Sequence, residues 1–309
     1  MLHIILSLSL IINIIIFYMD ISKLAENIKK YKIIGIGEAT HGQLKFNEFK
    51  NKLVKKMITK YNFRVIVIED QYSCIKIIDK YIKNKDVNYL DGLNSFPFLS
   101  KTFVSLLKWL RNYNIKNNNK ISIIGIDCQY TCPKYKSKSE INKYVNTLIK
   151  KLNKISCSNS PKRLNFRDKC MYEIFIKQYN ENKKYLIFAH NGHLQKEPYN
   201  KDDKIKWFGN YLYNKFGSDY CAIGNTFYTG KYLAKNIDDN YKVGIANINV
   251  KKKLNSGIFY INKNDIIEIY DGSVTYSSKN PNKTFYKNYT NNRFNILIVI
   301  NNELPFTLI

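Results

Sequence analysis

The pattern that most constrains the fold is an alternation of short apolar runs with longer amphipathic stretches, which starts near residue 32. The runs are four to eight residues long and rich in β-branched residues, as is typical of buried strands. They cover residues 32–37, 64–69, 121–127, 185–190, 220–227 and 294–300. The stretches between them have apolar residues three and four positions apart, which predicts helices over 46–61, 70–84, 101–113, 140–153, 166–181 and 203–216. The alternation predicts an α/β fold with a mainly parallel sheet and helices on both faces.

Two segments stand outside this alternation. Residues 131–165 carry no strand signal, and we expect a small helical insertion, or cap, at about this position. Residues 271–292 are polar and rich in turn-forming residues, which predicts a long loop before the last strand. A chain of 309 residues can bury a sizeable core, and we expect residues 19–309 to form one domain.

The chain begins with an almost unbroken apolar run, LHIILSLSLIINIIIFY, over residues 2–18. This run is slightly shorter than the roughly 20 residues that cross a bilayer. It also lacks the basic start and the small-residue cleavage site of a secretory signal. Met19 follows directly, so two alternatives stay open: residues 1–18 are an apolar transmembrane leader, or translation starts at Met19.

The basic run after the leader bears on localisation. The sequence KLAENIKKYK would stay on the cytosolic side of a membrane by the positive-inside rule. We therefore expect either a membrane-anchored protein with a cytosolic site or, if translation starts at Met19, a cytoplasmic protein.

The chain is strongly basic, with 50 Lys and Arg against 24 Asp and Glu. Such a balance often indicates an anionic partner, such as nucleic acid or a membrane surface. Only five of the basic residues are arginine, however, and the lysines are spread along the chain. Proteins that read nucleic acid specifically use arginine for bidentate contacts. We therefore expect no specific nucleic-acid partner, and membrane contact only through residues 2–18.

The six cysteines are scattered, and no two of them have CxxC spacing. The pair with the shortest separation, Cys128 and Cys132, has three residues between its members. Without zinc-site or redox spacing, the pattern favours buried thiols in a reducing compartment.

Acidic residues and histidines gather where four of the predicted strands end. In a parallel sheet, sites form where loops leave the carboxyl ends of the strands. Apart from His3, every histidine of the chain lies at such an end. Neighbouring acids and imidazoles tune each other's pKa values for proton transfer, so the sequence predicts an acid–base centre. The strand-end groups are Glu38, His41, Glu69, Asp70, Asp127, His190 and His193.

The type of chemistry follows from what accompanies these groups. The sequence has no GxSxG nucleophile elbow and no cysteine with an evident base beside these loops, so a covalent mechanism has little support. Water activated by a carboxylate and a histidine fits better. Gly37 and Gly42 bracket Glu38 and His41, and we expect them to permit a sharp turn and the close approach of a ligand.

Two other classes of function stay open. The same glutamates and histidines are acceptable metal ligands, so a metal-dependent hydrolase is one alternative. A non-enzymatic basic protein that binds a membrane or nucleic acid is the other.

Eight blocks of sequence follow one another from about residue 31 to the C-terminus. They read IIGIGEATHG, FKNKLVKKMITKYNFRVIVIED, LLKWLRNYN, IIGID, RDKCMYEIF, YLIFAHNGHL, FGNYLYNKFGSDYCAIGNTFYTG and FNILIVINNELPFTL. In this order they resemble the blocks of the erythromycin esterase family, and GEATHG and HNGH are specific at this separation.

The resemblance implies a hydrolase that opens cyclic esters without a metal or other cofactor, on a small-molecule ester or lactone. Carried over by position, His41 would be the general base, and Glu38 and Glu69 would orient the water and the imidazole. By the same resemblance, His190 and His193 would polarise the carbonyl group or bind the substrate.

The resemblance also implies two substrate-binding residues and one departure from the family. Lys50 stands where the family has a basic residue that points into the cleft, and Arg167 begins the RD helix of the family. The region between IIGID and RDKCMYEIF is shorter here than in typical members, where it builds a helical cap. A shorter cap implies a more open or a smaller pocket.

Overall fold

A computed structural model of the chain describes residues 21–309, except 94–98, 156–159, 198–204, 237–240, 248–252, 263–266, 273–274, 277–284, 290–291 and 306. The apolar leader at residues 2–18 lies outside the described residues. Among the helices that the structure describes, none combines the length and the hydropathy of a membrane span.

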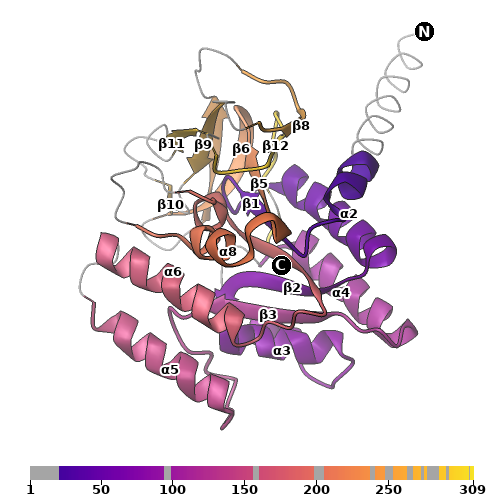
Figure 1. Cartoon of the computed structure of the whole chain (residues 1–309), viewed down its shortest axis with the longest axis vertical. Helices are drawn as coiled ribbons and strands as arrows, with labels where there is room; N and C mark the ends of the chain where they lie inside the picture. Colours follow the sequence, from indigo (N-terminus) through magenta and orange to yellow (C-terminus); the bar gives the residue numbers. More distant parts are fainter. Residues whose placement is uncertain are drawn as a thin grey trace.

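A seven-stranded sheet forms the centre of the molecule (Figure 1). Its strands have the order β3-β2-β4-β1-β5-β12-β8, and each neighbouring pair is parallel except the edge pair of β12 and β8. The strands are β1 (Ile33–Glu38), β2 (Phe63–Gln71), β3 (Ser122–Asp127), β4 (Lys184–His190), β5 (Tyr220–Thr226), β8 (Gly257–Tyr260) and β12 (Ile296–Val299). The prediction of a mainly parallel α/β sheet is confirmed.

Helices cover both faces of this sheet. The longer ones are α2 (Leu44–Tyr61), α3 (Tyr72–Ile82), α4 (Lys101–Lys116), α5 (Glu140–Asn153), α6 (Pro161–Ile176) and α8 (Phe208–Phe216). Short turns of helix are α7 (Asn191–Leu194), η1 (Tyr89–Gly92) and η3 (Gly217–Asp219). Helices α2 and α4 lie over one face, and α5, α6 and α8 lie over the other (Figure 1).

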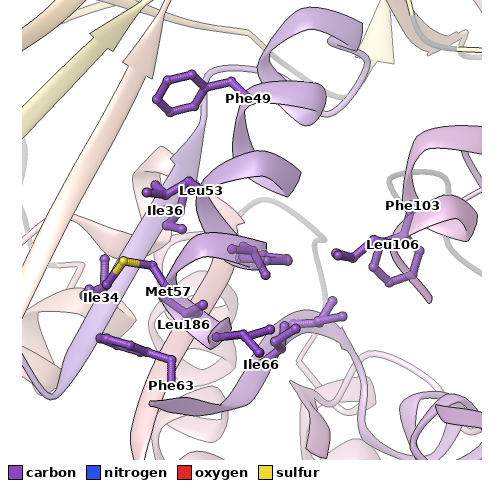
Figure 2. Close-up of a cluster of buried hydrophobic side chains, with 14 of the residues drawn as sticks. Ile34, Ile36, Phe49, Leu53, Met57, Phe63, Ile66, Phe103, Leu106 and Leu186 are labelled. Atoms are coloured by element: carbon purple, nitrogen blue, oxygen red, sulfur yellow. The ribbon is translucent and has the colours of Figure 1, made fainter. Parts of the chain in front are cut away.

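Each face of the sheet has its own hydrophobic core, because successive side chains of a strand point to opposite faces. Ile34 and Ile36 of β1 pack with Leu53 and Met57 of α2 in one core (Figure 2). Ile33, which directly precedes Ile34 in β1, points to the other face and belongs to the second core, together with residues of α6. All six residues of β1 are buried, which explains why this strand is a continuous apolar run.

The remaining strands form two small sheets. β6 (Thr229–Asn236) pairs with β7 (Tyr241–Asn247) and β10 (Thr275–Tyr276), and β9 (Glu268–Gly272) pairs with β11 (Phe285–Tyr289). The prediction of a long loop over residues 271–292 is therefore wrong for its strand residues. The strands within residues 271–292 are short and polar, so their sequence lacks the apolar period of two that signals a strand. They form by pairing with other segments, β10 with β6 and β11 with β9.

Several helix boundaries also differ from the prediction. Helix α6 begins at Pro161 rather than residue 166, because Ser160 caps it and Pro161 occupies its first turn. Helix α3 begins at Tyr72 rather than residue 70, because β2 continues to Gln71. Helix α8 begins at Phe208 rather than residue 203.

Within residues 131–165 the structure places α5 and the start of α6. Val145, Leu148 and Leu152 of α5 share a core with Met171 and Phe175 of α6. Helix α5 thus extends the helical layer beside α6 (Figure 1). A role of this segment as a cap over the site stays a prediction.

Candidate active site

The carboxyl ends of three adjacent strands bring the predicted groups together. Glu38 ends β1 and is the register partner of His190, which ends β4. Glu69 lies near the end of β2, which pairs with β4 on its other side. Because these strands are parallel neighbours, groups that are far apart in the sequence meet at one edge of the sheet.

Glu38, His41 and Lys50 form a first buried cluster. His41 lies in the loop after β1, and its Nδ1 is 3.0 Å from Oε2 of Glu38. Lys50, on α2, donates from Nζ to the other carboxylate oxygen, Oε1. All three side chains are at most 9% exposed, so the carboxylate is shared by two donors away from water.

A second cluster surrounds Arg167 of α6. The guanidinium donates to both oxygens of Asp127, from Nε at 3.1 Å and from Nη2 at 2.8 Å. Nη2 also lies 2.8 Å from Oε1 of Glu69. His193 of α7 contacts the same Glu69 oxygen through Nε2 at 3.2 Å, and its Nδ1 lies 2.7 Å from Oδ1 of Asp168.

His190 joins the two clusters through its backbone and its ring. Its backbone N–H donates to Oε2 of Glu69 at 2.8 Å, and its ring lies 5.7 Å from that of His41, centroid to centroid. Its Nδ1 accepts from the backbone of Gly192, so Nε2 carries the hydrogen and donates to the carbonyl of Ala39. The His190 ring thus caps α7 and connects it to the loop after β1, and its predicted role toward the substrate stays a prediction.

The two clusters shift the pKa values of their members. Burial alone would raise the pKa of Glu38, but the nearby Lys50 and His41 outweigh it and lower this pKa. Burial also opposes ionisation of Glu69, yet His193 and Arg167 hold its pKa well below the usual range. Burial would lower the pKa of His193, but Asp168 and Glu69 raise it to about 10. These shifts favour the ionised forms of Glu38 and Glu69 and the charged form of the His193 ring.

Two asparagines hold the strand ends in place. The side chain of Asn191 bonds to both backbone groups of Asn225, accepting from N at 3.0 Å and donating to O at 2.7 Å. The side chain of Asn225 in turn accepts from the backbone of Ala39 at 3.3 Å. A Cβ at Gly37 would lie 2.3 Å from the Asn191 amide oxygen, so glycine is required there.

The C-terminal segment supports the His41 loop from the other side. Glu303 accepts from the backbone N–H groups of Lys45 and Phe46 at the start of α2, at 2.6 and 3.2 Å. It also accepts from the amide of Gln43, whose oxygen accepts from the backbone of Thr40. The loop that carries His41 is thus fixed by a carboxylate 262 positions later in the chain.

The structure also explains Gly42. A Cβ at this position would lie 1.7 Å from the carbonyl oxygen of Leu233 in β6. Gly37 and Gly42 therefore admit Asn191 and the β6 backbone, respectively. The approach of a ligand to these two glycines stays a prediction.

The residues with a predicted catalytic or substrate-binding role all lie at this end of the sheet, in the two clusters and the link between them: Glu38, His41, Lys50, Glu69, Arg167, His190 and His193. Asp70, in contrast, bonds to the backbone of Gln71 and the hydroxyl of Tyr130. Sequence reasoning missed Asp168, Asn191, Asn225 and Glu303. Asn191 and Asn225 are polar residues within or just after strand-end motifs, which could have marked them, whereas no local signal marks Glu303.

Positively charged side chains occupy the positions beside the carboxylates of the site where a metal ion would bind. Lys50 and Arg167 already bind the carboxylates that a cation would need. Within the described part of the chain, no three His, Cys, Asp or Glu side chains are arranged to hold a metal ion.

Comparison with known proteins gives both a family and a fold. The family described as Erythromycin esterase matches residues 58–158 and 148–255, which include the Arg167 cluster and the HNGH motif. No curated protein matches the chain.

Solved structures share the fold over nearly the whole chain. A protein from Bacillus cereus is 20% identical, with a TM-score of 0.75 over 92% of this chain and 91% of that one. A succinoglycan biosynthesis protein is 15% identical, with a TM-score of 0.72 over 92% of this chain and 91% of that one. A mutant of an erythromycin esterase in its open conformation is 12% identical, with a TM-score of 0.64 over 93% of this chain and 94% of that one. At these identities the similarity shows the fold alone.

Proposed function

The chain belongs to the erythromycin esterase family, and we propose that it is a hydrolase that cleaves an ester or lactone with water activated by His41. The observation that carries this proposal is the buried contact of 3.0 Å between His41 Nδ1 and Glu38 Oε2. A histidine oriented by a carboxylate is the usual arrangement of a general base.

The contact with Glu38 assigns the protons of His41. A nitrogen that faces a carboxylate oxygen carries the hydrogen, so Nδ1 donates to Glu38; in the neutral ring that a general base requires, Nε2 has the lone pair. Lys50 keeps Glu38 ionised, because it helps to lower the pKa of this carboxyl group against the effect of burial. Nε2 of His41 is then the atom that takes a proton from water.

The reaction that we propose has two steps. The water oxygen attacks the carbonyl carbon while His41 Nε2 accepts a proton, and a tetrahedral oxyanion forms. The bond from carbon to the alcohol oxygen then breaks, and His41 returns the proton to that oxygen. The positive charges of Arg167 and His193 support the oxyanion, a contribution that is typically worth about 10²–10³-fold in rate.

A panel of simple esters and lactones, followed by acid release, tests this function. We expect His41→Ala to lose about 10²–10⁴-fold in kcat, the usual size of general-base help, with little change in melting temperature. The loop position of His41 contributes little to the core, so folding should survive. Full turnover by the folded variant would contradict the role assigned to His41.

Measurements on the same purified protein distinguish the proposed function from a metal-dependent hydrolase and from a non-enzymatic basic protein. Stoichiometric zinc or manganese in the purified protein, with activity lost to a chelator, would favour a metal-dependent hydrolase. Salt-sensitive binding to anionic lipid or RNA, with no hydrolysis across the panel, would favour a non-enzymatic basic protein.

A further inference from the structure

Asp168 is a fully buried carboxylate behind the site. Its Oδ1 lies 2.7 Å from His193 Nδ1 and accepts from the backbone of Phe208 at 2.9 Å. Its Oδ2 is also buried and has no hydrogen-bond partner among the residues that the structure describes. A buried carboxylate is costly unless an opposite charge accompanies it, and the ring of His193 is its direct side-chain partner.

The other ring nitrogen of His193 also faces a carboxylate. Nε2 lies 3.2 Å from Oε1 of Glu69, so hydrogen-bond acceptors flank both nitrogens. Nη1 of Arg167 lies 3.3 Å from Nε2, and a neutral ring could accept from it. A neutral ring, however, would turn its lone pair toward the Glu69 carboxylate, which is repulsive.

The balance of charge decides between the two forms of the ring. Three buried carboxylates (Glu69, Asp127 and Asp168) surround a single guanidinium, that of Arg167. A neutral His193 would leave two negative charges of this cluster uncompensated, whereas a charged ring leaves one. Because uncompensated charge is costly away from water, the buried cluster favours the charged form of the His193 ring, which leaves the smaller net charge.

We propose that Asp168 is a positioning residue that holds His193 as a doubly protonated ring, and that His193 serves hydrolysis as a fixed positive charge rather than as a proton-transfer group. This inference rests on the proposed function, in which His41 alone moves protons. The raised pKa of His193, about 10, agrees with the geometry.

The pH dependence of hydrolysis follows from the groups that face His193. These are Asp168 and Arg167 from α6, Glu69 from β2, and Asp127 from β3, which acts through Arg167. The T-shaped contact of the His193 ring with Trp207 adds no charge. Because the carboxylates keep the ring charged, we expect His193 deprotonation to lower the rate only as the pH approaches about 10.

The first test needs no substrate. In wild-type protein labelled with ¹⁵N-histidine, and with the signal assigned by His193→Gln, we expect both ring nitrogens of His193 to be protonated at pH 8. A neutral ring at pH 8 would overturn the proposal. This result stands whether or not an ester is cleaved, so it separates a failure of this inference from a failure of the proposed function.

The second test is Asp168→Asn. We expect the pKa of His193 to fall by about 1–3 units, as when a carboxylate partner is lost. In the ester assay we expect kcat to fall by up to about tenfold at pH 8, where a ring whose pKa has fallen to about 7 is about one-tenth charged, and to recover toward acidic pH, where the ring regains its charge. An unchanged His193 pKa, or an equal loss of rate at all pH values, would overturn the role of Asp168.

Asp79→Asn is the matched control. Asp79 is also a buried aspartate that accepts from a backbone N–H, that of Ile123 at 2.9 Å, but it lies on α3 and pairs with Lys83 outside the site. We expect this variant to lose stability while the pH profile of hydrolysis and the His193 signal stay as in the wild type.

Discussion

At the scale of single residues, the site depends on charges that are buried in pairs. Glu38 and Lys50 lie at most 6% exposed, so each needs the other to offset the loss of hydration. Arg167 likewise offsets the buried negative charges of Asp127 and Glu69. These pairs favour ionised carboxylates close to His41, as the proposed general base requires.

Replacement of Lys50 by methionine tests the first pair. Because it leaves Glu38 as an uncompensated buried charge, we expect the free energy of unfolding to fall by about 3–5 kcal/mol in urea titrations. Lys29→Met is the control, since the side chains of Lys29 and its partner Glu26 are 47% and 55% exposed and such a surface pair contributes little to stability. Equal losses in the two variants would argue against a special role of burial at Lys50.

The pKa of His193 predicts how stability depends on pH. Asp168 and Glu69 raise this pKa from 6.5 to about 10 against the effect of burial. The resulting stabilisation is fully present below pH 6.5 and is lost as pH rises to about 10. We expect the free energy of unfolding to decline across this window, and the decline to be shallower in His193→Gln. An identical slope in the variant would contradict the prediction.

Carboxylates give the opposite dependence at low pH. The pKa of Glu69 lies well below 4.5 because His193 and Arg167 overcome burial. Its stabilisation is present above pH 4.5 and is lost as pH falls through the lower folded value.

At the scale of secondary-structure elements, helix α2 shows how distant parts of the chain position the site. Its first turn has no acidic residue and no side-chain cap of its own. Glu303 supplies the missing carboxylate, which satisfies two free N–H groups and suits the positive end of the helix dipole. The same carboxylate is linked through Gln43 to the loop of His41.

Glu303→Ala tests this arrangement. We expect it to destabilise the protein by about 1 kcal/mol, as the loss of a helix cap usually does, and also to lower kcat, because the His41 loop loses a support. Ser139→Ala is the matched control, since Ser139 caps α5 at Asn142 N. A thermal melt and the ester assay on both variants should show a similar stability loss and a selective loss of activity in Glu303→Ala. An unchanged kcat in Glu303→Ala would show that the Glu303 cap does not support the catalytic position of the His41 loop.

At the scale of the whole molecule, two hydrophobic cores cover the two faces of the central sheet, and the candidate site lies at the carboxyl ends of its strands. The described cysteines lie within these cores or in a small cluster beside α3, and each is at most 3% exposed. All five are free thiols, as the scattered sequence positions predicted.

Thiol labelling should therefore report the unfolding of the whole domain. In a Cys157→Ser background, which removes the one cysteine outside the described residues, we expect native protein to react slowly with a thiol reagent. The rate should rise with urea in parallel with the loss of circular dichroism, since the cores open together. Rapid labelling of the native protein would show that part of a core opens locally.

The sequence by itself determined the parallel α/β sheet, because buried strands and amphipathic helices carry local patterns with periods of two and 3.6 residues. It also placed Glu38, His41, Glu69, His190 and His193 at strand ends, where the topology of a parallel sheet gathers them.

Only the tertiary structure decided how these groups are paired. The contact of Asp168 with His193, the cap that Glu303 provides and the parallel pair of β6 and β10 all join segments that are far apart in the chain. No local pattern records such contacts, because their free energy comes from burial and charge that exist only after the chain has folded. The role of His190 in polarising the carbonyl group or binding the substrate stays a prediction, and the contact of its ring with the carbonyl of Ala39, 151 positions earlier, exists only in the folded chain.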